Sequence, residues 1–418
     1  MDNNKRKILI ISEGYFPLSR AGVIITTRIC EELAKNGENV AVYITGNSPK
    51  NIQYLNEHHG VRILNGNSFN NHTSYHQLKL KLFGQNVFRK VINFILNLFS
   101  CDKFDWLSML KEKKEIVRII KYGGYEIIIS ISYPITNHII AYNIRKNMNI
   151  KWIACYLDPY TFNWQLDISR LVSRLKLEKK LLKKADVIMA QSFIFNDFKN
   201  CELKYYLQKS VQFELPCIIP IYHLTNSHIS RNDSKSINCL FIGTLYYDIR
   251  NPEFLFELFV KLNRDINLTI IGNRNCKFPD NYFENWKKIL PDRLRIYDRV
   301  SLEKAKSAML NADILINVDN SLTNQMPSKI IDYISSGKPV INICKIRNSP
   351  SLFYTNKYPL CLTLFEENGL TLDIIESVEH FCYQYKGKKV DYKLIEKLYI
   401  SCTPEYVGGQ FASIIDDL

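Results

Sequence analysis

The 418-residue chain lacks the sequence features of several protein classes. Its eleven cysteines are scattered singly from Cys30 to Cys402, with no Cys-x-x-Cys pair and no Cys/His cluster at zinc spacing, which disfavours a structural metal or a disulfide framework. Its longest apolar stretches are about ten residues, short of the ~20 that cross a bilayer. The basic first residues lead straight into a strand-length apolar run without a small-residue cleavage site. We therefore expect no secretory leader and a soluble protein with reduced thiols.

Glycine and proline are scarce as well, with 16 and 14 residues, which excludes collagen-like and low-complexity classes. Apolar residues make up 46% of the chain and aromatic residues 12%, enough to bury a large core in two or three domains. The formal net charge of +14 favours an anionic partner, either nucleic acid, a phosphorylated small molecule or an acidic membrane surface. Because no nucleic-acid-binding motif accompanies the charge, we expect no nucleic-acid partner.

The N-terminal half alternates strand and helix patterns. Continuous apolar runs, typical of strands buried on both faces of a parallel sheet, alternate with segments of helical period. Strands are expected at residues 8–12, 40–45, 126–131, 151–156 and 187–190, and helices at residues 26–36, 137–147 and 168–185. This alternation predicts an α/β fold with a doubly wound parallel sheet.

A second unit of the same kind follows an irregular stretch at residues 216–233, which we interpret as an interdomain linker. Strands are expected at residues 238–242, 268–271, 314–318 and 340–343, and helices at residues 252–262, 302–310 and 328–335. We therefore expect Rossmann-like domains over residues 1–215 and 216–395, facing a cleft where ligands meet the carboxyl ends of both sheets. Residues 396–418 remain as a C-terminal segment.

Residues 75–121 have the character of a basic, apolar insertion in the first domain. Phe, Ile and Leu are concentrated between Phe88 and Phe99, and cations such as Arg89 and Lys90 lie among them. Two interpretations stay open. A basic amphipathic helix can lie in a membrane interface with its cations on anionic head groups, or the segment is an ordinary helix that covers the sheet.

Three places in the N-terminal half put small or polar residues at the end of a strand. Ala21-Gly22 lies in the loop before the first helix, where glycine lets the backbone approach a phosphate; a plain strand–helix turn is the alternative. His138 lies just inside a helix at the carboxyl end of a strand, and is either a functional rim residue or a structural histidine. Asp158 ends the next strand at the same rim, where it is either functional or a turn-forming or capping residue.

In the C-terminal half, Gly243 and Thr244 follow an expected strand and begin a loop that reaches Arg250. Glycine at a strand end permits close approach of a ligand, and arginine is suited to bind a diphosphate through two parallel hydrogen bonds. A solvent-exposed arginine without a ligand is the alternative.

A further segment of the C-terminal half combines Asn324 with the start of a helix. Pro327 suits the first helical turn, and the free N–H groups of Ser328 and Lys329 suit an anion. Asp332 lies one turn further on, where a carboxylate can accept both hydroxyls of a ribose. A capped structural helix that ends at a glycine is the alternative.

Together these segments resemble the GT-B glycosyltransferases of family 4, over residues 7 to about 340. The most specific part is residues 327–341, which is similar to the family's P-S-K-hydrophobic-x-E/D-Y-x-x-x-G-K-P-V segment. His138, four residues after Pro134, and the Asp-Pro-Tyr segment that starts at Asp158 are similar to the signature of a bacterial polysaccharide-biosynthesis subgroup. The resemblance implies two Rossmann-like domains, transfer from a nucleotide-sugar with retention of configuration, no metal or other cofactor, and a C-terminal helix, residues 407–417, that crosses back to the first domain.

Some positions differ from the family pattern. The two acidic residues that many members have eight apart are Asn324 and Asp332 here, and an arginine common after the second-domain glycine is Thr244. Arg250 and Lys329 then carry the positive charge for the phosphates. Amides also bind sugar hydroxyls, so Asn324 keeps a place in the donor site. The chain has no Asp-x-Asp motif, in keeping with cationic side chains in place of a metal ion.

The resemblance therefore implies a metal-independent, hexosyltransferase-type enzyme with His138, Arg250 and Lys329 as catalytic residues. It would move a sugar from a nucleotide diphosphate donor to a lipid-linked or saccharide acceptor, in synthesis of a bacterial capsule, O-antigen or exopolysaccharide. We expect it in the cytoplasm, peripheral on the anionic inner face of the plasma membrane. Two alternatives stay open: a nucleotide-sugar epimerase of the same architecture, and a catalytically inactive scaffold protein.

Overall fold

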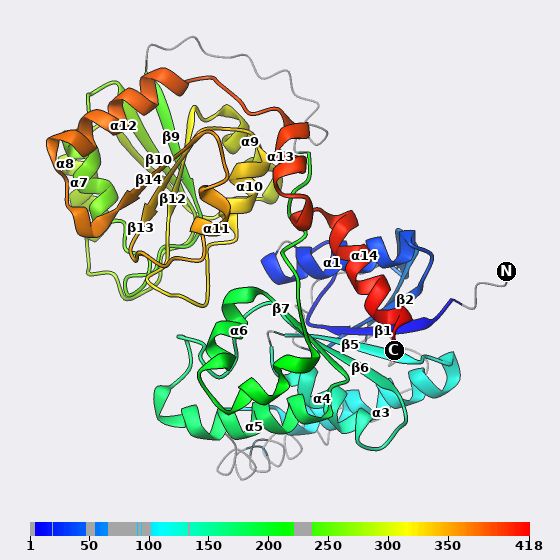
Figure 1. Ribbon diagram of the computed structural model, residues 1–418. Helices are drawn as coiled ribbons and strands as arrows, with labels where there is room; N and C mark the ends of the chain where they lie inside the picture. The colour runs from blue at the N-terminus through cyan, green and yellow to red at the C-terminus, as the bar shows by residue number, and fades with distance from the viewer. Residues whose placement is uncertain are drawn as a thin grey trace, which may run out of the picture. The chain divides into compact units, whose positions relative to one another are not determined.

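The computed structural model describes residues 5–18, 20–46, 55–65, 90, 93, 102–132, 134–220 and 236–418. The chain forms two compact units, the first from Met1–Pro216 together with Pro404–Leu418 and the second from Cys217–Thr403. Each unit has its own parallel sheet with helices packed on it (Figure 1). The predicted α/β class with two doubly wound parallel sheets is confirmed.

Unit 1 is built on a sheet whose described strands run in the order β3-β4-β2-β1-β5-β6-β7-β8, parallel throughout except for the β3–β4 hairpin. Its central strands are buried on both faces because parallel sheets are covered by helices on each side. The strands are β1 (Lys7–Ser12), β2 (Asn39–Ile44), β3 (Glu57–His58), β4 (Val61–Asn65), β5 (Ile127–Ser132), β6 (Lys151–Tyr156), β7 (Val187–Ala190) and β8 (Ser210–Gln212).

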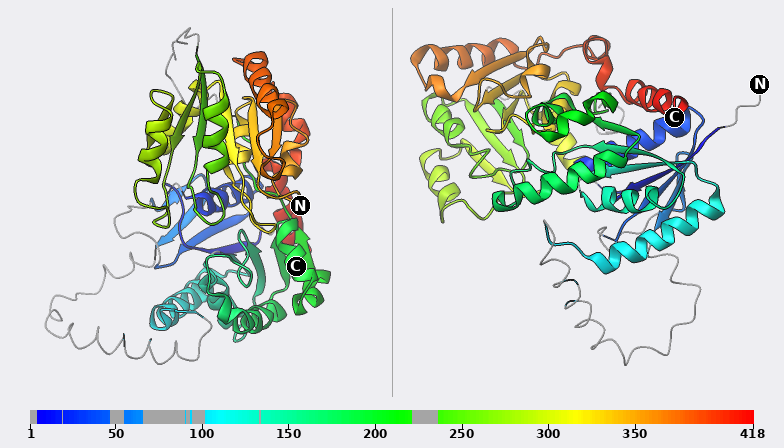
Figure 2. Two further views of the ribbon diagram at one scale, coloured as in Figure 1. Left: turned by 90° about the vertical axis from the view of Figure 1, so that its left-hand side faces the viewer. Right: turned by 60° about the horizontal axis from the view of Figure 1, so that its bottom comes forward.

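Helices cover both faces of this sheet. Helices α3, α4 and α5 lie side by side on one face, and α14, from the C-terminus, packs against α1 on the other (Figures 1 and 2). Gly408 permits this contact, because a Cβ there would lie 2.4 Å from the Cβ of Glu32. The helices are α1 (Ala21–Lys35), α3 (Trp106–Gly123), α4 (Thr136–Arg145), α5 (Leu171–Lys184), α6 (Ser192–Lys199) and α14 (Pro404–Asp416), with 3-10 helices at Ile168–Arg170 and Glu202–Lys209.

Unit 2 has a parallel sheet in the order β11-β10-β9-β12-β13-β14. Apolar side chains of the central strands and of α7 and α12 form its core. The strands are β9 (Ile237–Ile242), β10 (Ile266–Ile271), β11 (Leu294–Tyr297), β12 (Ile314–Val318), β13 (Val340–Cys344) and β14 (Cys361–Phe365). The helices are α7 (Glu253–Lys261), α8 (Tyr282–Ile289), α9 (Leu302–Asn311), α10 (Lys329–Ser335), α11 (Leu352–Thr355), α12 (Leu372–Tyr385) and α13 (Tyr392–Leu398), with 3-10 helices at Glu366–Asn368 and Ile400–Cys402.

The start of α1 corrects one expectation. The helix begins at Ala21, whereas the apolar period predicted a start at residue 26, so Ala21 and Gly22 form its first turn instead of lying in the preceding loop. The residue before the helix is Arg20, whose side chain makes no capping hydrogen bond. The usual start signal of a Ser, Thr, Asp or Asn cap is therefore missing.

The basic, apolar stretch from Phe88 to Phe99 lies outside the described residues apart from Lys90 and Asn93. The end of the expected insertion is described and forms α3, an amphipathic helix that buries Met109, Ile116 and Ile120. Within the described residues, no helix is both long and apolar enough to cross a membrane.

Candidate functional site

The carboxyl edge of the unit 2 sheet brings Gly243, Thr244 and Arg250 together. Gly243 follows β9 directly and packs against Gly272, which follows β10. Gly272 has φ +146°, and a Cβ on it would lie 1.9 Å from the Gly243 carbonyl oxygen, so only glycine fits there. A Cβ on Gly243 would lie 3.9 Å from Nη1 of Arg250. The nearest atom to that Cβ is Cζ of the Phe241 ring at 3.2 Å, so a side chain at 243 would press on Phe241 rather than on the guanidinium group.

Arg250 is held in place by neighbours on both sides. Its Nε donates to Oδ1 of Asn320 at 3.0 Å and its Nη1 donates to the Thr244 carbonyl at 3.1 Å. The guanidinium lies over the Tyr246 ring, 5.7 Å from its centroid. No hydrogen bond of the described residues involves Nη2, which leaves that nitrogen for a ligand. Burial lowers the pKa of Arg250, and the nearby charge of Asp319 opposes this shift, so the group stays a cation.

Asp319, directly after β12, places a buried carboxylate behind Arg250. It is fully buried, and its Oδ2 accepts hydrogen bonds from the hydroxyls of Ser349 and Ser351. Its Oδ1 accepts from the backbone N–H of Asn320 at 2.8 Å. Burial raises the pKa of Asp319, while the serine hydrogen bonds, the Asn320 N–H and the Arg250 charge act against that rise. The carboxylate fixes the strand end that carries Asn320, the partner of Arg250.

Helix α10 is joined to the same edge of the sheet through Tyr333. The Tyr333 hydroxyl accepts from the Ile242 N–H at 2.7 Å and donates to the Ile242 carbonyl at 3.1 Å. Asn324, in the loop before the helix, is 9% exposed, and the Nδ2 of Asn320 donates to the Gln325 carbonyl at 3.0 Å. Unit 2 thus holds the β9 end, the β12 end and α10 as one assembly.

Lys329 and Asp332 form an ion pair across the first turn of α10, with Nζ and Oδ2 2.7 Å apart and both side chains about one-third exposed. Each is therefore accessible to a ligand. The helix itself begins at Lys329, with Ser328 as its N-cap and Pro327 before it. Pro327 and Ser328 therefore precede the helix, whereas the sequence predicted them in its first turn. Because α10 has only seven residues, its dipole is small. Positive charge at this site comes mainly from side chains.

In unit 1, the first turn of α1 lies beside the end of β6. A Cβ on Gly22 would contact Cδ1 of Leu157 at 3.6 Å, an ordinary distance, so packing alone does not require glycine there. Asp158 follows Leu157 and is partly exposed. The first turn of α1, which holds Ala21 and Gly22, thus lies beside Leu157, the neighbour of Asp158, at the carboxyl edge of the sheet.

His138 is fully buried, which agrees with the interpretation as a structural histidine and not with a position on an exposed rim. Its Nδ1 lies 2.7 Å from the Ser130 hydroxyl, and its ring packs edge-on against Tyr156 with centroids 4.6 Å apart. Burial lowers the pKa of His138 to about 3, so the ring is neutral at physiological pH. Its Nε2 is buried without a hydrogen-bond partner among the described residues.

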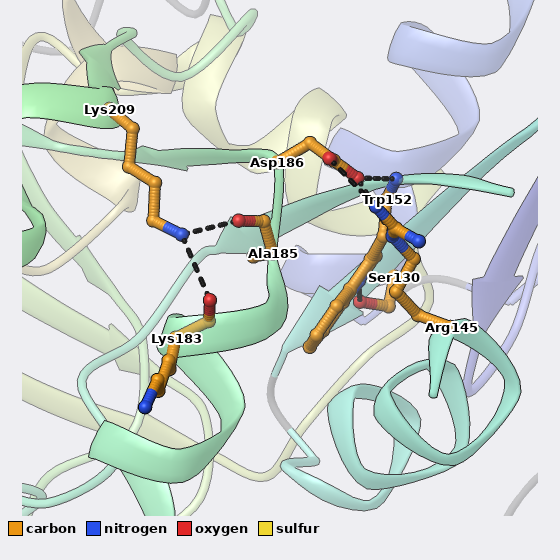
Figure 3. A network of polar contacts seen from close by, with 7 residues as sticks. All are labelled: Ser130, Arg145, Trp152, Lys183, Ala185, Asp186 and Lys209. Carbon is orange, nitrogen blue, oxygen red and sulfur yellow. Dashed lines mark hydrogen bonds and ion pairs between the residues drawn. The ribbon is translucent and has the colours of Figure 1, made fainter. Parts of the chain in front are cut away.

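Ser130, the hydrogen-bond partner of His138, is held in place by a network around Trp152. The Trp152 indole N–H donates to the Ser130 hydroxyl at 2.7 Å, and the Trp152 backbone N–H donates to Asp186 at 2.8 Å, which also binds Arg145 (Figure 3). Since the indole is a donor only, the Ser130 hydroxyl is free to give its proton to Nδ1 of His138. In this arrangement the neutral ring carries its own proton on Nε2.

A second buried network fixes the segment after Asp158. Glu178 of α5 is fully buried, and one of its oxygens accepts from the hydroxyl and the N–H of Thr161. Burial raises the pKa of Glu178 to about 7. Arg174, also buried, donates to the carbonyls of Thr161 and Asp167. The loop between β6 and α5 is therefore tied to the helix that follows it.

No protein-family model matches the chain, and no curated protein matches it in sequence. Solved structures do match over nearly the whole length. Sucrose-phosphate synthase from Thermosynechococcus elongatus aligns with a TM-score of 0.66 at 15% identity, covering 99% of each chain. HepE of Anabaena in complex with UDP and glucose gives 0.63 at 10% identity, covering 99% of this chain and all of that one. The lipopolysaccharide outer core galactosyltransferase WaaB gives a TM-score of 0.56 at 14% identity, covering 99% of this chain and all of that one.

These similarities define the class of the fold. The chain has the two-domain GT-B fold of glycosyltransferases, as the sequence predicted. At sequence identities of 10–15%, these similarities identify the fold and not the substrate.

Sequence reasoning missed several residues that build the two sites. Asp319 and Asn320 read as an ordinary polar turn after a strand, and Ser130 and Glu178 read as members of a strand and a helix. Their partners lie far away in the chain, such as Ser349 for Asp319. An acidic residue directly after an apolar run of strand length is the signal that a search of strand ends in the sequence would have found.

Proposed function

We propose that the protein is a glycosyltransferase that moves a sugar from a nucleotide diphosphate donor to a lipid-linked or saccharide acceptor. The transfer retains the anomeric configuration, needs no metal ion and serves synthesis of a bacterial surface polysaccharide. One observation carries the proposal. Arg250 is anchored beside Gly243, with Lys329 and Asp332 on the helix that Tyr333 ties to the same strand end.

The donor is assigned to unit 2. Two hydrogen bonds fix the plane of Arg250 and leave its Nη2 for a phosphate oxygen. Lys329 adds a second positive charge, and Asp332 offers two carboxylate oxygens to the two hydroxyls of a ribose. Asn324 and the backbone at Thr244 contribute polar groups for the sugar.

Charge development explains why these cations suit the reaction. The bond between the anomeric carbon and the diphosphate oxygen breaks, the sugar becomes oxocarbenium-like, and negative charge gathers on the leaving phosphate. The acceptor hydroxyl oxygen forms the new bond, and its proton passes to the leaving diphosphate oxygen. Arg250 and Lys329 stabilise the charge on the leaving group, and Asp319, hydrogen-bonded on both oxygens, keeps Arg250 oriented for it.

The acceptor is assigned to unit 1, at Ala21, Gly22 and Asp158. His138 is the proposed catalytic residue of this unit, as a neutral donor through its Nε2–H. Its pKa of about 3 excludes a role as a cation at neutral pH. The unpartnered Nε2 supports the assignment, because a buried donor without an acceptor costs stability that a bound hydroxyl would recover.

A peripheral membrane position, in the cytoplasm, completes the proposal and is supported by two helices of unit 1. Exposed apolar side chains flank the start of α5, with Ile168 75% and Val172 62% exposed. The exposed cations of α3 and α5 are Lys111, Lys114, Arg118, Lys121, Lys176, Lys180, Lys183 and Lys184. Lysines near an anionic bilayer contribute ~1 kcal/mol each. Co-sedimentation with anionic but not zwitterionic vesicles, reduced by I168S/V172S, is the expected result; equal sedimentation with both would refute this part.

The experiment for the whole proposal measures release of nucleoside diphosphate. UDP-sugars are the first donors to try, because the similar HepE structures hold UDP or UDP-glucose. We expect release that depends on a membrane-lipid or saccharide acceptor and a product with the donor's anomeric configuration, in the presence of EDTA. Conversion of the donor without any acceptor would instead identify an epimerase. If the protein binds no nucleotide at all, the result would favour the alternative of a catalytically inactive scaffold protein.

A further inference from the structure

Three potential metal ligands meet at the edge of the unit 1 sheet, in a cluster formed by Glu31, His58 and His59. Glu31 is on α1, His58 ends β3, and His59 is the first residue of the turn that leads to β4. One donor atom from each side chain lies within 4.8 Å of the others. The cluster is separate from the donor residues, all of which belong to unit 2.

The closest pair in this cluster has the spacing of metal ligands. Nδ1 of His58 lies 3.1 Å from Oε1 of Glu31. That nitrogen is buried, yet it makes no hydrogen bond within the described part of the chain. Zinc–ligand bonds of about 2.0 Å in a tetrahedron separate neighbouring donor atoms by about 3.3 Å. The His58–Glu31 distance is close to this edge length.

The hairpin turn positions the third ligand. His58 pairs with Val61 across the β3–β4 ladder, so His59 and Gly60 form a two-residue turn, and both have positive φ, 50° and 77°. Turns of this kind favour Asn or Asp at the first place and Gly at the second. His59 is exposed at the tip, and its side chain can rotate to close the remaining gap.

We propose that Glu31, His58 and His59 bind a divalent first-row transition metal, with Zn²⁺ as the cellular occupant. Two imidazoles and one carboxylate form a ligand set that zinc uses, with water in the fourth position. The spacing rules applied to the sequence missed this site because its carboxylate comes from a helix that precedes both histidines, and because the histidines are adjacent.

The proposed ion joins three parts of unit 1. It connects α1 to the β3–β4 hairpin, and His58 also stacks on Phe16, with ring centroids 4.3 Å apart and planes 17° from parallel. Phe16 belongs to the loop that leads into Ala21 and Gly22. Metal binding would therefore hold Phe16 in place through His58, and the proposal holds whether or not the protein transfers sugars.

The test is zinc titration by calorimetry on tag-free full-length protein. All samples carry Cys276→Ser, which removes an exposed thiol, because thiolates are zinc ligands. We compare His58→Gln and His59→Gln with the matched control His380→Gln, a change of an exposed histidine on α12 of unit 2. We expect about one zinc per chain at micromolar affinity or tighter, at least tenfold weaker binding in both cluster variants, and no change in the control.

Equal affinity in all variants, or an equal loss in the control, would overturn the proposal. Circular dichroism and thermal melting without metal check that each variant is folded. If His58→Gln does not fold, His59→Gln decides the matter, because His59 is exposed. Zinc should also raise the melting temperature of the protein with an intact cluster and not that of His59→Gln.

Discussion

Replacement of Asp332 by Asn tests the donor site most directly, because the structure predicts a small effect on protein stability and a large effect on nucleotide binding. Asp332 pairs with Lys329 three residues earlier, with both side chains about one-third exposed. Exposed helical pairs of this kind stabilise a protein by about 0.3–0.5 kcal/mol. Loss of the pair should therefore leave the free energy of unfolding almost unchanged.

Binding should change much more. If Asp332 accepts both ribose hydroxyls, Asn replaces one acceptor oxygen by a donor that faces a hydroxyl. A lost hydrogen bond to a charged group together with a mismatched donor costs about 1–3 kcal/mol, which is roughly a 5- to 150-fold higher dissociation constant. The change also frees Lys329 from its partner, so contacts to phosphate persist. The loss should consequently appear for the nucleoside as well as for its diphosphate.

Calorimetric titration with UDP and with uridine measures both effects. The matched control is Glu284→Gln, which breaks another i,i+3 ion pair of unit 2, between Glu284 and Lys287 of α8. The control should bind UDP as the wild type does. Equal UDP binding by Asp332→Asn and the wild type would refute the ribose assignment. A loss of binding that accompanies a large loss of stability would show instead that Asp332 supports the fold.

Three other changes test the remaining parts of the two sites. Arg250→Lys keeps the charge but cannot span both anchoring acceptors, so titration should show nucleoside diphosphate binding weakened at least tenfold; Arg274→Lys in the same unit is the control, and equal losses would remove Arg250 from the site. His138→Ala removes a buried ring, so chemical denaturation should show a loss of roughly 2–4 kcal/mol, and turnover per folded molecule decides its catalytic role, since unchanged turnover would make it purely structural. Glu178 has a folded pKa of about 7, above the ordinary 4.5, so its stability contribution is complete below about pH 4.5 and declines by about 3 kcal/mol as pH rises to 7. Denaturation of Glu178→Gln at several pH values should show a flatter profile over this range, and an unchanged slope would contradict the raised pKa.

The sequence predicted the central strands of both sheets and missed strands that lie at the sheet edges or, like β4, next to one. Residues 8–12 and 126–131 are continuous apolar runs and lie in the centre of the unit 1 sheet as β1 and β5. The missed strands β11 and β14 form the two edges of the unit 2 sheet and are only partly buried. An edge strand needs fewer apolar residues, so its run is shorter and mixed with polar ones.

The candidate site also contains features that neighbouring residues predict and features that depend on residues far away in the chain. Gly243, Lys329 and Asp332 were predictable because each lies at a strand end or in the first turn of a helix, and a few neighbouring residues define those places. Which side chain anchors Arg250 was not predictable, since Asn320 is separated from it by three strands of the chain. Pattern reasoning finds the positions where ligands bind but not the contacts that orient them.

His138 shows why position at a strand end is insufficient evidence of exposure. The side chain begins a helix at the carboxyl edge, as predicted, yet it turns into the core because Ser130 and Tyr156 offer a partner and a packing surface there. A neutral imidazole can be buried at modest cost when one nitrogen is hydrogen-bonded. Its second nitrogen is the part that remains unexplained by the fold, and a bound hydroxyl would account for it. The proposed role of His138 therefore rests on Nε2, and a His138→Phe variant, which keeps a ring but has no donor, separates that contribution from packing.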